Sequence, residues 1–103
     1  MKEIQNKKTE ITENRIKFQG DENKKVSYSD LLSIVLDIVP QGGFTPTDIH
    51  NRMRIKNQLN NNTDKVVIKL EDADYKNLVA LINISRWPFY DAELEEFLNN
   101  FKY

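Results

Sequence analysis

The side chains that could perform acid–base or metal chemistry are one histidine, His50, and two groups of carboxylates. No carboxylate or second ligand lies at a metal-binding spacing from His50. The carboxylate groups are Glu71, Asp72 and Asp74, and Glu93, Glu95 and Glu96. Both groups fall in the first turns of predicted helices, where negative charge complements the helix dipole. The sequence also lacks cysteine, a Gly-rich phosphate loop and a nucleophile elbow. We therefore expect no enzyme, no metal or cofactor site and no small-molecule substrate.

The predicted helix over residues 46–59 carries side chains of the types that contact phosphates and base edges. The candidates for DNA binding are Asn51, Arg52, Arg54 and Gln58. A preceding helix and a connector containing glycine favour a helix-turn-helix. However, residues 26–64 hold more acids than bases, and the connector over residues 40–45 is longer than the usual turn. A small DNA-binding regulator is therefore the alternative hypothesis.

Arg52 and Lys56 also occupy an unusual position on this helix. At about 100° per residue, both project into the arc that contains Ile49, Met53 and Leu59. The simpler interpretation is that their aliphatic stems cover apolar surface while their charges stay in water. The other interpretation is that the arc is divided between the core and a partner, whose carboxylates the two cations meet.

An aromatic segment surrounds Pro88, between the last two predicted helices. Exposed aromatic side chains beside an arginine are typical of a protein-binding hot spot. A platform for stacking bases would need neighbouring cations, whereas acids follow this segment. The predicted protein-binding residues are thus Arg52, Lys56, Arg86, Trp87, Phe89 and Tyr90.

The elements that must position these residues are organised around Val26–Val39, which is apolar over most of a helical circumference. Such a helix needs neighbours on several sides. We predict a mostly helical α+β fold. Its helices span residues 27–39, 46–59, 73–84 and 91–101. In its small sheet 15–18 is the expected partner of 66–70, with 24–27 as a candidate third strand. We predict a disordered tail over residues 1–10 and a single globular domain over residues 11–103.

Composition narrows the classes of partner. The chain has 103 residues, 39% of them hydrophobic, and a formal net charge of −1. This balance predicts no general attraction to nucleic acid or to an acidic membrane. The longest apolar run, Leu78–Ile82, is too short to span a membrane. We therefore expect a soluble protein with no membrane partner.

Two stretches, Gly43–Leu59 and Ile68–Leu98, resemble small uncharacterised proteins encoded by tailed-phage and prophage genomes. The shared pattern is a helix start at Phe44–Asp48, the motif LEDADY at Leu70–Tyr75, and Trp87-Pro88 before an acidic helix. This resemblance implies a phage accessory or minor virion protein that acts through protein contacts. The partner would be another phage protein, a host protein or a second copy. The location would be the cytoplasm of a bacterial host, or the virion.

Overall fold

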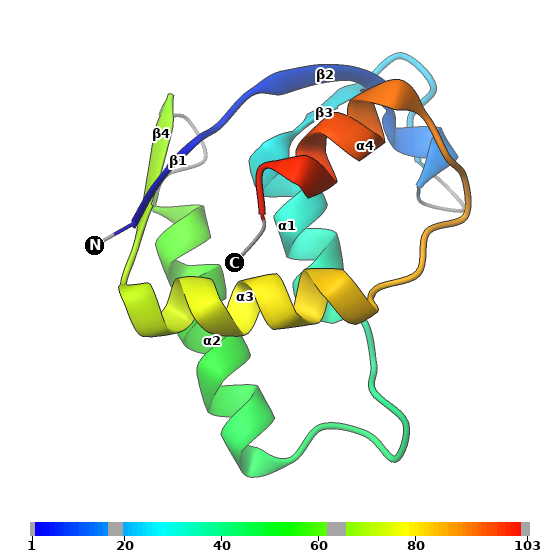
Figure 1. Cartoon of the computed structure of the whole chain (residues 1–103). Coiled ribbons are helices and arrows are strands. Elements are labelled where there is room, and N and C mark those ends of the chain that lie inside the picture. The colour runs from blue at the N-terminus through cyan, green and yellow to red at the C-terminus, as the bar shows by residue number, and fades with distance from the viewer. Residues whose placement is uncertain (1, 17–19, 62–65, 102–103) are drawn as a thin grey trace.

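A computed structural model describes residues 2–16, 20–61 and 66–101 of the chain (Figure 1). The predicted class, α+β and mostly helical, is confirmed. The strands in these residues are β1 (Lys2–Gln5), β2 (Lys8–Thr12), β3 (Lys25–Ser27) and β4 (Val67–Leu70). The helices are α1 (Tyr28–Asp37), α2 (Pro46–Asn60), α3 (Asp72–Ile84) and α4 (Ala92–Asn99), with a 3-10 turn at Glu13–Arg15. Strands β2 and β3 and helix α4 lie at one end of the molecule, and the loop between α1 and α2 lies at the other (Figure 1).

Helix α1 is the centre of the core, as its composition predicts. It begins at a capping box, in which the Ser27 amide donates to the Asp30 carboxylate over 2.9 Å. It packs against both α2 and α3. Its buried apolar side chains are Tyr28, Leu31, Leu32, Val35 and Leu36. The helix ends at Asp37, two residues before the predicted end, because Pro40 disfavours helical backbone just before it.

Helix α2 begins where the sequence indicates. Thr45 and Asp48 form a reciprocal capping box, each side chain accepting from the other's amide over 3.1 Å, and Pro46 occupies the first helical position. Only Ile55 and Leu59 of this helix are buried. Most of the circumference of α2 is therefore at or near the surface.

The predicted strand pairing is wrong. We expected residues 15–18 to pair with 66–70, but Arg15 lies in the 3-10 turn, Ile16 lies in a turn, and positions 17 and 18 lie outside the described residues. The partner of β4 is β1, antiparallel, with Ile4 opposite Ile68. The candidate strand 24–27 is confirmed as β3, and it pairs with β2 in a second two-stranded sheet.

The prediction of a disordered tail over residues 1–10 is also wrong. This segment runs as an extended ribbon past β4 and on to α4 (Figure 1). Ile4 and Thr9 are buried, the Asn6 side chain accepts from the Ser29 amide over 3.0 Å, and the Lys7 carbonyl accepts from the Tyr28 amide over 2.9 Å. A short strand needs few inward residues, because alternate side chains face water. The polar composition of residues 1–10 therefore does not indicate that this segment covers part of the core.

Most of the aromatic side chains near the C-terminus fill the core above α1. Phe97 and Phe101 are fully buried, with ring centroids 5.0 Å apart, and the rings of Tyr28 and Phe97 meet edge-to-face with centroids 5.1 Å apart. Edge-to-face contacts of this kind add to the gain from burial. They fix α4 over the start of α1.

Candidate protein-interaction surface

Arg52 is engaged within the chain. Its Nη1 donates to the carbonyl oxygens of Leu36 and Ile38 over 2.7 and 2.9 Å, and its guanidinium carbon lies 4.8 Å from the centroid of the Phe44 ring. The last turn of α1 contains no basic residue of its own. Arg52 therefore caps the C-terminal end of α1 from α2, where a cation is favourable.

Lys56 also reaches α1. Its Nζ lies 2.6 Å from Oδ1 of Asp37, in an ion pair that is partly exposed to water. This arrangement fits the simpler interpretation, in which the aliphatic stems of the two cations pack on apolar surface and their charged groups stay in water. In addition, the polar partners of both cations come from α1. No partner protein is needed to place them inside the apolar arc.

Two of the four predicted DNA-binding residues, Arg54 and Gln58, converge on a buried carboxylate. Asp74 of α3 is only 1% exposed. Arg54 contacts its Oδ1 through Nε at 2.9 Å and Nη2 at 2.8 Å, and Gln58 donates to its Oδ2 over 2.9 Å. Asn51 accepts a longer bond of 3.4 Å from Arg54. This network joins α2 to α3, because a buried carboxylate requires a charged or hydrogen-bonding partner.

The predicted aromatic hot spot is partly buried and partly exposed in the structure. Trp87 packs against the core, with its ring edge-on to Phe97 at 6.2 Å, and its buried Nε1 has no hydrogen-bond partner among the described residues. Phe89 is half-buried under the guanidinium of Arg15, 4.4 Å from the ring centroid. Arg86 and Tyr90 are exposed, and Tyr90 is 94% exposed. Only these two of the four are displayed to a partner.

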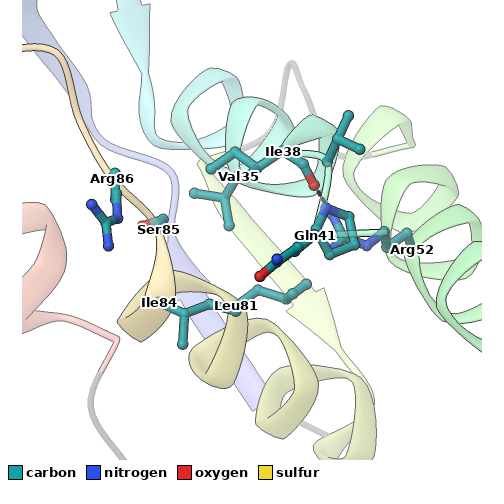
Figure 2. Close-up of a pocket in the computed structure, with 10 residues that line it drawn as sticks. Val35, Ile38, Gln41, Arg52, Leu81, Ile84, Ser85 and Arg86 are labelled. Atoms are coloured by element: carbon teal, nitrogen blue, oxygen red, sulfur yellow. Dashed lines mark hydrogen bonds between the residues drawn. The ribbon is translucent and has the colours of Figure 1, made fainter. Parts of the chain in front are cut away.

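A groove opens between the C-terminal ends of α1 and α3 (Figure 2). We call it the α1–α3 groove; its volume is about 360 Å³. Val35 and Ile38 lie on one side of it and Leu81 and Ile84 of α3 on the other, and the amide of Gln41 extends between them (Figure 2). Its lining residues are Val35, Ile38, Val39, Pro40, Gln41, Arg52, Leu81, Ile84, Ser85 and Arg86. Arg52 and Arg86 are the predicted site residues that the structure brings to it.

A second, shallower hollow of about 150 Å³ adjoins the first, and Arg52 lines both. Exposed apolar side chains gather around these two hollows. Six of the nine large hydrophobic side chains that are exposed in the described part of the chain belong here: Ile38, Val39, Phe44, Ile49, Met53 and Ile84. We call this set the Arg52 surface. A grouping of this kind marks an interaction site more often than scattered exposed side chains do.

None of these six side chains was a predicted binding residue, although Ile49 and Met53 lie in the arc that was considered for a partner. Ile38 and Val39 continue the apolar run of α1, and Ile84 ends that of α3, so all three were assigned to helices that pack in the core. The signal that could have found them is the helix stop that follows: Pro40 after α1 and Ser85 after α3. Ile38 and Val39 lie beyond the end of α1 and Ile84 is the last residue of α3, so the helical periodicity before them does not show that they are buried.

Metal-binding groups and membrane-spanning helices are absent from the described ranges. Those residues contain no group of three or more His, Cys, Asp or Glu side chains placed to hold a metal ion. None of the four helices has the length and apolar character needed to cross a membrane.

Comparison with protein-family models, with curated proteins and with solved structures finds no match to this chain. The resemblance to phage-encoded proteins therefore stays a prediction, and the function must be proposed from the geometry of the Arg52 surface.

Proposed function

We propose that this protein is a non-enzymatic interaction or assembly module, encoded by a phage or prophage, that binds a protein partner through the Arg52 surface. The partner is another phage protein, a host protein or a second copy of the chain. The proposal keeps Arg86 from the predicted site and adds the exposed apolar side chains around Arg52.

One observation carries the proposal. Ile84 and Val39 are 73% and 65% exposed, and both line the α1–α3 groove. Fully burying an aliphatic side chain of this size contributes about 1.5–3 kcal/mol. Covering both therefore supplies several kcal/mol toward binding, in a hollow that already has a concave shape.

The alternative, a DNA-binding regulator, has less support. Arg52, Arg54 and Gln58 direct hydrogen bonds to α1 and α3, so base contacts would compete with bonds inside the chain. Fluorescence anisotropy with a random DNA duplex tests this alternative. Affinity that falls steeply between about 50 and 200 mM salt would revive it.

The test of the proposal compares two variants matched in chemistry and exposure. Ile84→Asp places a charge on the groove, whereas Val66→Asp places one beside β4, where Val66 is 71% exposed. Each tagged protein is used to enrich partners from a lysate of cells that make it, and bound proteins are quantified by mass spectrometry. Sedimentation velocity over a concentration series measures self-association in parallel.

We expect the wild-type chain and Val66→Asp to retain the same partner or the same dimer, and Ile84→Asp to lose at least nine-tenths of it. Equal recovery by all three proteins, or neither a partner nor a dimer with the wild type, would contradict the proposal. Matching circular dichroism spectra and melting temperatures establish that Ile84→Asp is folded.

A further inference from the structure

The charges lining the α1–α3 groove suggest what occupies it. Its ten lining residues include two arginines, Arg52 and Arg86, and no aspartate or glutamate, although the whole chain has a net charge of −1. The C-terminal ends of α1 and α3 add about half a negative charge each. The lining residues and helix ends therefore sum to about +1. The nearest aspartates line the neighbouring hollows, Asp37 paired with Lys56 and Asp48 beside Arg52, so Arg86 carries the unbalanced positive charge. An anionic group is favoured there over a cationic one.

Two polar side chains at the groove are not used by the fold. Within residues 2–16, 20–61 and 66–101, neither the Gln41 amide nor the Arg86 guanidinium forms a hydrogen bond or an ion pair. Figure 2 shows Gln41 reaching between the two walls and Arg86 at the margin, beyond Ser85. A few polar groups around an apolar floor are typical of a binding site, since they orient the ligand.

The walls of the groove favour a helix over an extended peptide. Both walls are the ends of helices, and they present the side chains of Ile38, Leu81 and Ile84. A strand laid here would face apolar side chains with unpaired amides and carbonyls, which is costly. A helix satisfies its own backbone and offers apolar residues at intervals of three and four.

We infer that the α1–α3 groove binds an acidic amphipathic helix of a partner protein, with apolar residues between Ile38 and Ile84 and a carboxylate at Arg86. This inference rests on the proposed function and names its ligand. A second copy of the chain is a poorer fit, because α4, its acidic helix, buries Leu94 and Phe97 within its own core.

The experiment is an unbiased selection with the full chain. Immobilised protein selects from a displayed library of random 16-residue peptides, and enrichment is counted against the Ile84→Asp variant. We expect the enriched peptides to have apolar residues at i, i+3 or i+4, and i+7, flanked by Asp or Glu. The most enriched peptide is then synthesised with a fluorescent label, and its affinity is measured by anisotropy.

Two matched pairs of variants test the contacts. Affinity should fall at least tenfold with Ile84→Asp and stay unchanged with Val66→Asp. It should fall about three- to tenfold with Arg86→Ala and stay unchanged with Lys8→Ala, which removes an exposed cation from β2. A proline at the centre of the peptide should abolish binding, whereas a proline at its first position should not, because only the central one breaks the helix.

Enriched peptides that are basic, uncharged or unaffected by the central proline would overturn the inference, as would the absence of enrichment over Ile84→Asp. A wild-type dimer that Ile84→Asp dissociates would also overturn it, since a second copy would then occupy the groove. If a lysate partner depends on Ile84 but no acidic helix is selected, the proposed function stands and this inference fails. If neither an Ile84-dependent partner nor an acidic helix is found, the proposed function and this inference are both refuted.

Discussion

Replacing Arg52 with alanine should destabilise the protein, even though sequence patterning placed this residue on both predicted binding surfaces. Its Nη1 donates to the carbonyls of Leu36 and Ile38 over 2.7 and 2.9 Å. In the Arg52→Ala variant these carbonyls, at the end of the central helix, lose their cation. Water can reach only part of the space that the side chain leaves, because Arg52 is half-buried.

The magnitude follows from three contacts. A hydrogen bond from a charged donor contributes about 1.5–3 kcal/mol when buried. Partial exposure lowers that figure, so we take about 1 kcal/mol for the pair of bonds. The cation at a helix C-terminus adds about 0.3–1 kcal/mol, and the contact with the ring of Phe44 adds about 0.5 kcal/mol. The expected loss in the free energy of unfolding is therefore about 2 kcal/mol.

Urea denaturation followed by tryptophan fluorescence measures this loss. Trp87 is the only tryptophan, and its contact with Phe97 is broken on unfolding. With a slope of about 1–3 kcal/mol/M, the midpoint should move down by roughly 1 M urea. Arg86→Ala is the matched control: it removes an exposed arginine from the same groove and should change the free energy of unfolding by less than about 0.5 kcal/mol.

Equal midpoints for the wild type, Arg52→Ala and Arg86→Ala would refute the capping role. Arg52 would then be a surface cation available to a partner or to DNA. Arg52→Lys should fall between the wild type and Arg52→Ala, because one ammonium group reaches a carbonyl less well than a planar guanidinium does.

Three further predictions test the packing and the electrostatics. Ile4→Ala should lower the free energy of unfolding by about 2 kcal/mol in urea titrations, whereas a change of less than about 0.5 kcal/mol would mean that β1 does not cover the core. Arg54→Ala should lower the free energy of unfolding by about 2–3 kcal/mol, because it leaves the buried carboxylate of Asp74 without its cation. A smaller decrease for Arg54→Ala than for Asp74→Asn would contradict this. The Glu93 amide, followed by Arg15, holds the pKa of Asp91 below its ordinary value of 3.8. The unfolded chain thus binds a proton at higher pH than the folded one, so this stabilisation is complete at neutral pH and is lost as the pH falls below that value. Melting temperatures from pH 7 to pH 3 should therefore decline less for Asp91→Asn than for the wild type, and parallel curves would argue against the contact.

Local signals in the sequence were sufficient to predict the helices. The predicted helix starts at residues 27 and 46 coincide with capping boxes at Ser27 and Thr45, which form as hydrogen bonds in the structure. In α4 the buried residues Leu94 and Phe97 follow a helical spacing of three, which can be read from the sequence. Such signals act within one helical turn, so neighbouring residues contain all the information that they need.

The strand pairs could not be found in this way. The partner of β4 lies more than sixty residues away, in a segment whose polar composition predicted a tail. Pairing requires only one inward apolar residue, Ile4 opposite Ile68, together with backbone bonds that any sequence can form. The same limit applies to Asp74, since nothing near it in the chain shows that Arg54 and Gln58 surround it.

The fold class, the central helix and the helix boundaries, to within about two residues, follow from local sequence alone, because these depend on periodicity and capping. Which cations stabilise the fold and which face outward depends on how the helices pack against one another. Arg52 and Arg86 are alike in the sequence, yet one caps α1 and the other stands unpaired, within the described residues, at the margin of a groove. That difference depends on where α1, α2 and α3 meet, and contacts between distant elements leave no local pattern.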